Sequence, residues 1–370
     1  MNGQWLGRYL GTNSGTLVID LDDMGSNFAG WAYVYDDDTS KPGACAWITA
    51  NSNSDGFELT ADISPLDPQT GRPAKWLALA DKFPGVTFPS KAEIRGKLDA
   101  DVLSVEWKTN IGTSGSASLP KSEAAKKSFL PTNQLNWEDF KHYVGTLEHR
   151  RFIFRGQEEP WRLRTSFHRS GRANLARYVV DDIPTLHRHL SGRTQHIFNL
   201  SDSDQNGAFY NLAQHHGYPT PLLDWSYSPF VAAFFAYRRI TNSKAEKAKS
   251  DEKVRILMFD QRQWKADFPQ LPGVSWSKPH FSILEFIALN NERLIPQQSI
   301  SSLSNLDDIE TYINNKTIET KRMYLHAIDL PVTERPMVMK ELSMMGITAG
   351  ALFPGLDGAC EELRERAFDS

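Results

Sequence analysis

Apolar and polar residues alternate in short runs over the first third of the chain. The runs are rich in β-branched and aromatic residues, are separated by Gly, Asn, Asp and Pro, and cover residues 16–23, 28–38, 57–64, 91–99 and 101–109. Alternation with a period of two places one set of side chains on each face of a strand. The pattern predicts an all-β sandwich or small barrel over residues 1–112. We expect it to bind or to act as a scaffold, because nothing in it suggests catalysis.

The pattern changes after this domain. The next segment contains much Ser, Ala, Gly and Lys and hardly any large apolar side chain, which predicts a linker over residues 113–133. Beyond it, the apolar residues of 136–147 recur every three to four positions behind Asn136, a favourable N-cap, and predict an amphipathic helix. Residues 151–157 then have the composition of an apolar strand. We therefore expect residues 134–370 to form a second, mixed α+β domain.

A third pattern runs from residue 207 to residue 239. Its first part fits a helix that ends in a pair of histidines, with Gly217 as the glycine that follows a helix end. The next residues include two prolines, which exclude a helix and predict an extended segment. Ser228 then caps a new helix and Pro229 takes its first position. The nearly all-apolar residues that follow predict that this helix is buried.

Composition agrees with two folded domains and restricts where the protein works. Hydrophobic residues make up 40% of the 370 positions and aromatic residues 11%, which is enough for two cores. The sequence contains no run of eighteen apolar residues and no secretory signal, so we expect a cytoplasmic protein without a membrane partner. Cys45 and Cys360 match no metal or redox spacing and are expected to be unpaired.

The net charge of −4 is distributed unevenly. Residues 1–120 hold 9 Lys and Arg against 15 Asp and Glu, whereas the rest of the chain holds 32 against 30. This second part contains a local cluster of Arg162, Arg164, Arg169 and Arg172. Such a cluster could contact phosphates, although a solvated basic face is its commoner meaning. A nucleic acid partner is therefore compatible with the sequence.

The predicted strand after the first helix ends in Arg155, Gly156 and Gln157. Alternation places the guanidinium on the same face as an apolar neighbour. Gly156 lacks the Cβ that would block a close approach by a ligand, and the Gln157 amide both donates and accepts hydrogen bonds. The guanidinium suits a phosphate or a carboxylate. The alternative is an ordinary ion pair, for which Asp224 is a candidate.

Two further segments carry polar groups suited to a site. Asp224, Trp225 and Ser226 lie directly before the buried helix, whose free amide groups and dipole attract an anion; Asp224 could equally satisfy those amides itself. Gln297 and Gln298 follow a helix-like piece in an extended segment, where adjacent side chains face opposite ways. One of these amides could reach a sugar hydroxyl, and the solubility of an edge strand is the alternative.

Four motifs in this order resemble the FRG-domain family, which is named for its Phe-Arg-Gly. They are FRG, QHHGYPTPLLDWSYSPFVAAFFA, RLIPQQSIS and MGITAGALFPGLDGACEEL, at residues 154–156, 214–236, 293–301 and 345–363. The resemblance spans roughly residues 134–370, and the second motif is long and specific. The N-terminal β-domain lies outside it.

The family's pattern is similar to the ADP-ribosyltransferase fold, in which a split β-sheet grips NAD. The resemblance implies an ADP-ribosyltransferase that acts as a bacterial toxin or antiviral effector and modifies a macromolecule, with RNA or DNA slightly favoured over protein. NAD would be its substrate, no metal is expected, and a neutralising antitoxin is a candidate partner. The implied catalytic residues are Arg155, Asp224 and Gln298. The implied NAD-binding residues are Arg155, Gly156, Gln157, His216, Trp225, Ser226, Arg293 and Gln297.

The last position of the transferase pattern is usually a glutamate, and here a glutamine stands in its place. The glutamate stabilises positive charge on the ribose as the glycosidic bond breaks, which a neutral amide does less well. Glu285, Glu292 or Asp224 could supply the carboxylate instead.

Two other classes of function fit the same residues. One is a module that binds a nucleotide or partner without chemistry, which the missing glutamate favours. The other is a hydrolase or nuclease in which His215 or His216 acts with Asp224 as an acid–base pair.

Overall fold

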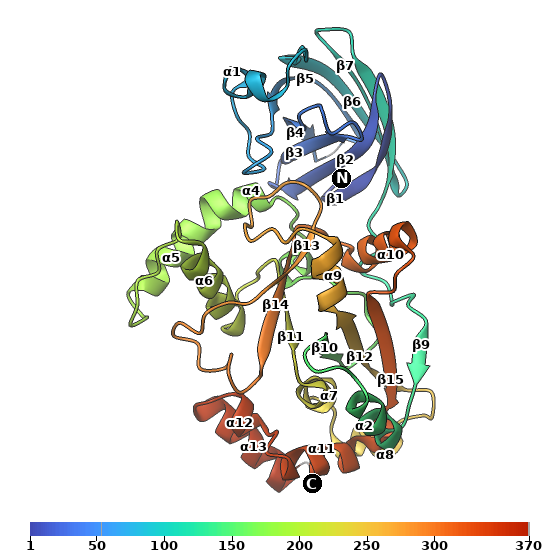
Figure 1. Cartoon of the computed structure of the whole chain (residues 1–370), viewed down its shortest axis with the longest axis vertical. Helices are drawn as coiled ribbons and strands as arrows, with labels where there is room; N and C mark the ends of the chain where they lie inside the picture. The colour runs from blue at the N-terminus through green and yellow to red at the C-terminus, as the bar shows by residue number, and fades with distance from the viewer. Residues whose placement is uncertain (53, 369–370) are drawn as a thin grey trace.

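The computed structural model describes residues 1–52 and 54–368, and it shows two domains stacked along the long axis of the molecule (Figure 1). The chain begins where the two domains meet, and it ends at the far end of the second domain (Figure 1). The first domain is all-β, and the second combines a sheet with helices. The two-domain expectation is thus confirmed at the level of fold class.

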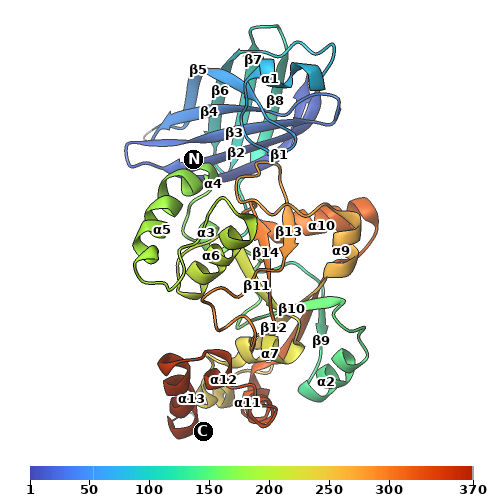
Figure 2. The ribbon, with the colours of Figure 1, turned by 60° about the vertical axis from the view of Figure 1, so that its left-hand side comes forward.

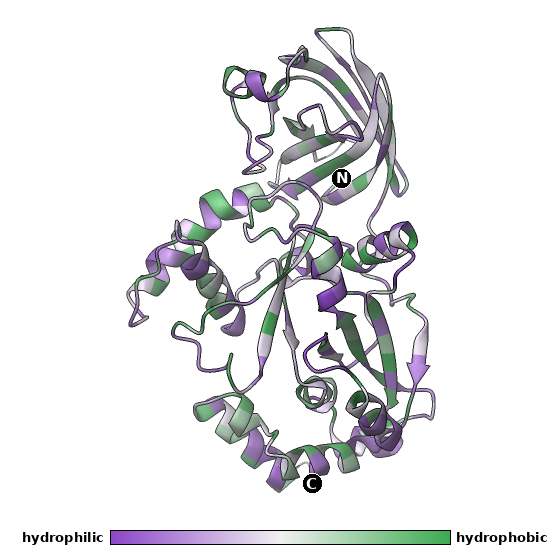
Figure 3. Ribbon diagram, in the orientation of Figure 1, coloured by the Kyte–Doolittle hydropathy of each residue, from purple (hydrophilic) through white to green (hydrophobic). Residues whose placement is uncertain are grey.

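The first domain is a closed barrel of eight antiparallel strands in sequence order. β1 pairs with both β2 and β8, which makes the domain a barrel and not a sandwich. Hydrophobic and hydrophilic positions alternate along the strands (Figure 3), and the inward set forms one core. The strands are β1 (Gly3–Gly11), β2 (Ser14–Asp23), β3 (Asn27–Asp36), β4 (Ala44–Asn51), β5 (Gly56–Pro65), β6 (Lys91–Asp99), β7 (Val102–Thr109) and β8 (Ser114–Pro120).

The last barrel strand corrects the predicted linker, because residues 114–120 form β8. Its buried positions are Gly115, Ala117 and Leu119, which alternate with exposed ones. A Cβ on Gly115 would lie 2.3 Å from the ring of Trp107, so this position has no room for a side chain. Small residues are required where the strand passes a large indole, and the strand therefore has the composition of a linker.

The second domain is built on a sheet of seven strands in the order β13-β14-β11-β10-β12-β15-β9. All neighbours are antiparallel except β15 and β9, which are parallel. The ADP-ribosyltransferase-like form of this sheet stays a prediction. The strands are β9 (Thr132–Gln134), β10 (Phe152–Gln157), β11 (Leu222–Ser226), β12 (Lys253–Asp260), β13 (Phe281–Leu284), β14 (Ser299–Ser304) and β15 (Leu325–Pro331).

Helices cover both faces of this sheet (Figures 1 and 2). One apolar core packs α2, α7 and α11 against one face, and a second packs α9 and α10 against the other. A third core holds the helices α3 through α6 together with β11 and β14. The helices are α1 (Trp76–Leu79, between β5 and β6), α2 (Trp137–Gly145), α3 (Ser166–Arg169), α4 (Leu175–Arg177), α5 (Ile183–Ser191), α6 (Ser203–His215), α7 (Pro229–Tyr237), α8 (Asn242–Lys247), α9 (Gln261–Asp267), α10 (Ile309–Thr320), α11 (Arg335–Met344), α12 (Ala349–Leu352) and α13 (Leu356–Phe368).

The predicted helix ends near the site are confirmed. Asn136 caps α2, since its side chain accepts from the Asp139 amide at 2.8 Å. Gly217 follows the end of α6 with a φ of +85°. Ser228 caps α7 by accepting from the Val231 amide at 3.2 Å, and this helix is buried as predicted.

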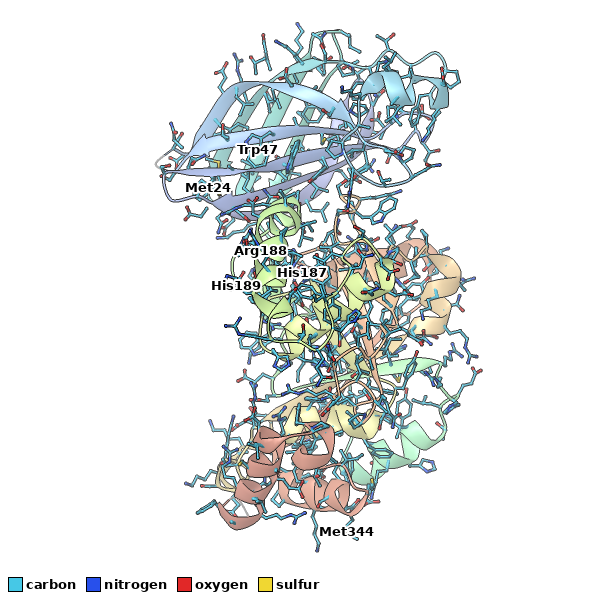
Figure 4. All side chains as sticks on the ribbon, turned by 90° about the vertical axis from the view of Figure 1, so that its left-hand side faces the viewer. Met24, Trp47, His187, Arg188, His189 and Met344 are labelled. Carbon is cyan, nitrogen blue, oxygen red and sulfur yellow. The ribbon has the colours of Figure 1, made fainter. Side chains whose placement is uncertain are left out.

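The side wall of the barrel rests on the second domain. Asp22 is only 1% exposed and accepts from Arg172 Nε at 2.9 Å and from the Ala173 amide at 2.8 Å. Figure 4 shows Met24 on the barrel just above the second domain, whereas Trp47 lies on the outer barrel wall. The two domains are therefore joined by buried polar contacts.

Candidate functional site

The Phe-Arg-Gly motif on β10 combines two structural residues with one polar one. Phe154 is 4% exposed and packs in the core beneath α7. A Cβ on Gly156 would lie 1.9 Å from the carbonyl oxygen of Ala232 and 2.7 Å from the amide nitrogen of Ala236. Gly156 is therefore needed for the close approach of α7 to β10. The expectation that it makes room for a ligand gains no support from this geometry.

Arg155 lies where β10 and β11 separate. Within the described residues, the two strands share one register pair, Phe154 opposite Ser226. Just beyond it, Arg155 Nη1 donates to the carbonyl oxygen of Asp224 at 2.5 Å, which replaces a strand-to-strand hydrogen bond. Its Nε is buried and finds no hydrogen-bond partner in the described part of the chain.

Burial also makes this guanidinium a strong attractor of anions. Desolvation, opposed by Asp224 and aided by the nearby Arg169, lowers the pKa of Arg155 to about 10. A charge that has lost its water is stabilised by any anion that binds next to it. Arg169 is itself exposed and donates to the Arg164 carbonyl at 2.6 Å. Arg155 and Arg169 thus give this side of β11 a positive potential.

Asp224 faces α6 from the middle of β11. Its Oδ1 accepts from Gln214 Nε2 at 2.5 Å, and Gln214 in turn accepts from the Thr220 hydroxyl. The Asp224 side chain is 38% exposed. Ser228 caps α7, and Ser226 accepts from the Ser228 amide, so the start of this helix does not use Asp224. The alternative in which Asp224 serves only that helix is therefore wrong.

His215 ends α6 with its ring turned toward Asp224. His215 Nδ1 lies 3.0 Å from Asn291 Oδ1, and the backbone amide of Arg293 donates to the same oxygen at 3.3 Å. Because that oxygen is an acceptor, Nδ1 carries the ring hydrogen. Nε2 of the neutral ring is then an acceptor, which is buried without a hydrogen-bond partner in residues 1–52 and 54–368. It lies 3.8 Å from Asp224 Oδ1.

Two facing acceptors at this distance need a donor between them. A hydroxyl group can supply it, and so can a proton on the imidazole, which would create an ion pair with Asp224. With Arg155 on the other side of Asp224, the site can hold an anionic group and a hydroxyl group together. The sequence-based site omits Gln214 and Asn291, and it includes His215 only in the hydrolase alternative. The short connection between the end of α6 and the start of β11 brings Gln214 and His215 close to Asp224.

Trp225 and Ser226 belong to the structural framework. Trp225 is 2% exposed and its Nε1 donates to Ser302 Oγ at 3.0 Å, on the face opposite to Asp224. Ser226 Oγ donates to the carbonyl oxygen of Gln297 at 2.7 Å. Neither side chain is directed at the Arg155 cluster, so the predicted NAD contacts of these two residues stay without structural support.

Gln157 and Arg293 differ in how their side chains are held. Gln157 stands opposite Arg255 in the β10–β12 register, and its buried side-chain oxygen Oε1 has no hydrogen-bond partner in the described part of the chain. Arg293 Nη1 donates to the carbonyl oxygen of His215 at 2.7 Å and so holds the end of α6. His216, the other histidine of the pair, is exposed, and it is His215 that reaches Asp224.

Gln297 and Gln298 lie in turns rather than in a strand, which corrects the predicted extended segment. The Gln298 amide donates to the Ile295 carbonyl at 2.9 Å, and Gln298 has a φ of +47° with an exposed side chain. Gln297 Nε2 donates to the carbonyl oxygen of Leu352 at 2.9 Å, which attaches this turn to α12. β14 begins only at Ser299.

Of the three candidates for the missing carboxylate, Asp224 is the one that lies beside Arg155 and His215. Glu285 is exposed and accepts from the Tyr227 hydroxyl at 2.6 Å. Glu292 is exposed as well, in the turn segment before β14. The predicted helix-like piece that carries both of them is turn and loop in the structure.

The arginine cluster that could have met phosphates is mostly paired. Arg162, Arg164 and Arg172 form ion pairs with Asp308, Asp307 and Asp22 at 2.6, 2.5 and 2.9 Å. The cluster therefore gives no reason to prefer a nucleic acid acceptor over a protein. In the described ranges no group of three or more His, Cys, Asp or Glu could hold a metal ion, and no helix is long and apolar enough to cross a membrane.

This geometry defines a polar binding site at the separation of two strands in a mixed α/β domain. Residues 150–245, which include Arg155, His215 and Asp224, match the family model described as the FRG domain. The match confirms the resemblance to the FRG-domain family over these residues, whereas the motifs at residues 293–301 and 345–363 lie outside it.

Comparisons with individual proteins add little to this assignment. No curated protein matches the chain. Among solved structures, a redesigned β-barrel is similar: it is 12% identical, and the match covers 33% of this chain and 91% of that one with a TM-score of 0.23. A likeness this weak carries no argument about fold or function.

Proposed function

We propose that the second domain binds NAD as a substrate and transfers its ADP-ribose to a macromolecule. The constellation of Arg155, His215 and Asp224 supports this most. Among the described residues, Arg155 Nε and His215 Nε2 are two of several buried polar atoms without partners, and these two lie beside Asp224. Native proteins rarely leave such atoms unpaired, and a ligand that binds between them would supply both partners. NAD offers the two groups that these atoms would take, a diphosphate and ribose hydroxyls.

Arg155 would hold the diphosphate. Its Nη1 is fixed by the Asp224 carbonyl, so the guanidinium is held in place before the substrate arrives. The separation of β10 and β11 at this point favours the split sheet of the ADP-ribosyltransferase fold, because a substrate can approach the strand edges there.

Asp224 and His215 would act at the ribose. A ribose hydroxyl donates to one of the two acceptors that face each other at 3.8 Å, and the carboxylate stabilises positive charge on the sugar ring. The bond from C1′ to the nicotinamide nitrogen breaks, and its electron pair stays on the nitrogen. Nicotinamide therefore leaves as a neutral molecule. The acceptor nucleophile then bonds to C1′, and its proton passes to His215 Nε2. Asp224 thereby takes the part of the usual glutamate.

The test incubates the purified full-length chain with NAD labelled in its adenine and with bulk RNA, DNA or lysate protein. Free nicotinamide and label transfer are both measured. We expect Arg155→Lys and Asp224→Asn to lower both by at least about 100-fold, because each removes charge stabilisation or bidentate geometry from the transition state. His215→Gln, which keeps hydrogen-bonding capacity but cannot take a proton, should lose transfer as well.

Glu292→Gln and Gln298→Ala are the matched controls, since both side chains are exposed in the turn segment before β14. They should keep full activity. The proposal is wrong if the folded wild type releases no nicotinamide and transfers no label, or if Gln298→Ala is inactive while Asp224→Asn is active. NAD binding without either product would instead support the non-catalytic binding module.

The toxin or antiviral role is a further part of this proposal, and it rests on the resemblance to the FRG-domain family. Induced expression of the wild-type chain should arrest bacterial growth, whereas Arg155→Lys should not. A neutralising antitoxin and a cytoplasmic location stay predictions that the same expression system can examine.

A hydrolase that uses His215 and Asp224 as an acid–base pair is the second candidate. The 3.8 Å separation of His215 Nε2 from Asp224 Oδ1 favours it, because a water molecule held between them could be activated. This function needs no NAD. Cleavage of RNA or DNA in the absence of NAD, lost in His215→Gln, would identify it.

A further inference from the structure

The barrel is not filled by its own side chains. It contains a cavity of about 420 Å³, lined by inward positions of its strands, among them Leu17, Ile19, Ile48, Ile94, Val105 and Trp107. Barrels of eight strands have an interior that side chains can just fill or that holds one small ligand. Here the volume falls within the range of small-molecule sites, so the second case applies.

Three alanines account for much of this space. Ala32 and Ala46 stand opposite each other on β3 and β4, and Ala92 lies on β6; all three are buried and line the cavity. At each of these inward positions a leucine or valine would occupy volume that is now open. Apolar cavities stay dry and are costly when empty, so a hydrophobic ligand stabilises such a barrel.

The cavity has a polar group at one end. Asp36 accepts from the Tyr9 hydroxyl and from Asn13 Nδ2, the latter at 3.2 Å, and Lys41 Nζ donates to Asn13 Oδ1 at 2.7 Å. All four residues line the cavity. Because one carboxylate and one ammonium stand there together, the charges offset each other and neither an acid nor an amine is favoured. This end suits an uncharged group that both donates and accepts hydrogen bonds.

The chain between β5 and β6, residues 66–90, closes this end. Residues 85–89 of the segment line the cavity together with the hairpin residues Thr12 and Asn13. The segment has a small core of its own, in which Trp76 stacks on Phe88 at 5.2 Å. Figures 1 and 2 show it with α1 at one end of the barrel.

The other part of this segment is held by the second domain. The carbonyl oxygen of Gly71 accepts from Ser277 Oγ at 2.8 Å, and Arg72 Nε donates to Ser275 Oγ at 3.1 Å. Gly71 has a φ of +68°, and a Cβ there would lie 2.6 Å from the ring of Trp276. Residues 71–72 are therefore fixed, whereas residues 85–89 of the same segment border the cavity.

We propose that the barrel binds one small, uncharged molecule that has an apolar body and a hydroxyl or carbonyl head. The body fills the space beside Ala32, Ala46 and Ala92, and the head meets Asp36 and Asn13. This site is separate from the Arg155 cluster, so its test does not depend on the transferase activity.

The test is a fluorescence titration of the full-length chain with N-phenyl-1-naphthylamine, an uncharged apolar probe. We expect saturable, blue-shifted emission with one probe for each chain. Decanol should displace the probe better than decanoate or decylamine, since the polar end of the cavity favours an uncharged head. If either charged compound competes better than decanol, the assignment of a neutral ligand is wrong.

Variants decide whether the probe sits inside the barrel. Ala92→Phe fills the cavity and should weaken probe binding at least about tenfold, which corresponds to 1.4 kcal/mol. Glu93→Phe, on the outer face of the same strand, is the matched control and should bind as the wild type does. Ala46→Leu, a smaller change, replaces Ala92→Phe if circular dichroism shows that the latter is unfolded. Equal binding by the wild type and a folded cavity-filling variant would overturn the proposal, and so would the lack of saturable binding.

Discussion

The two domains bury different kinds of groups at their centres. The barrel closes on itself, pairs its strands regularly, and places apolar side chains around an open cavity. The sheet of the second domain separates between β10 and β11, where the Arg155 side chain supplies a hydrogen bond that the strands do not make. A closed barrel satisfies the backbone hydrogen bonds of its strands without polar side chains. Where two strands separate, a polar side chain has to supply the missing hydrogen bond, as Arg155 does here. The irregular sheet therefore positions charged chemistry, and the regular barrel is suited to an apolar ligand.

Two glycines, one in each domain, differ in what a side chain would meet. Gly156 faces the carbonyl oxygen of Ala232, which belongs to a helix backbone. Gly7 on β1 faces Leu119 Cδ2 at 2.8 Å, the end of a flexible side chain, although other barrel glycines, such as Gly30, face backbone atoms as closely as Gly156 does. An alanine should thus be absorbed at Gly7 and not at Gly156.

The largest expected effect is that of Gly156→Ala. Its new methyl group would meet backbone atoms at 1.9 and 2.7 Å, so β10 and α7 must move apart. We expect a loss of about 3 kcal/mol or more in the free energy of unfolding, as for other severe overpacking changes. Urea unfolding followed by tryptophan fluorescence measures it.

Gly7→Ala provides the comparison in the barrel. Because Leu119 can change its rotamer, we expect a loss of about 1 kcal/mol or less. Equal losses for the two alanine variants would show that the barrel is packed as rigidly as the strand–helix contact of the second domain.

The sequence predicts regular elements better than it predicts which atoms meet. Period-two runs identified most barrel strands, and Ser228 with Pro229 identified the start of α7, since both signals are local. β8 was missed because two of its three buried residues, Gly115 and Ala117, are small, and the Trp107 ring that leaves no room for a side chain at Gly115 lies on the neighbouring strand β7.

The site shows the same limit. Arg155 and Asp224 were chosen from their motifs and do lie together, because each motif lies on one strand of the same sheet. The facing of His215 and Asp224 depends on how α6 returns onto β11, and the turn at Gln298 depends on hydrogen bonds from neighbouring loops. Neither follows from a local pattern.

The junction between the domains provides the second stability prediction. Asp22→Ala removes a buried carboxylate that accepts from Arg172, Ala173 and Asn174, and it leaves these donors unsatisfied. We expect a loss of about 2–3 kcal/mol, the usual cost of unsatisfied buried partners of a charged group. Calorimetry should then resolve two transitions, one for each domain.

Asp23→Ala is the control for that variant, because Asp23 is the exposed neighbour of Asp22. It should shift the transition by less than about 1 kcal/mol. A single, unshifted transition in Asp22→Ala would mean that the other contacts between the domains, such as those of Gln4 with Asn305 and Asp307, hold the barrel without Asp22.

A pH dependence of stability is expected at the same junction. Burial raises the pKa of the Asp20 carboxyl from 3.8 to about 8, with Asp22 and Asp307 adding to the shift and a hydrogen bond from Gln4 opposing it. The folded protein therefore keeps a proton on this group that the unfolded chain releases. Its contribution to stability is complete below about pH 4 and is lost as the pH rises toward about 8.

Asp20→Asn keeps the shape of the side chain and is neutral at every pH. Between pH 5 and pH 8 the free energy of unfolding of the wild type should fall by up to about 1.4 kcal/mol per pH unit relative to that of the variant, so that at pH 8 the variant has the higher melting temperature. Asp62→Asn, an exposed change on β5, should keep the wild-type slope. If Asp20→Asn and the wild type show parallel slopes over this range, Asp20 is ionised in the folded protein. The junction would then bury three carboxylates near one another, and the ion pairs of Asp22 and Asp307 with Arg172 and Arg164 would have to offset the added charge.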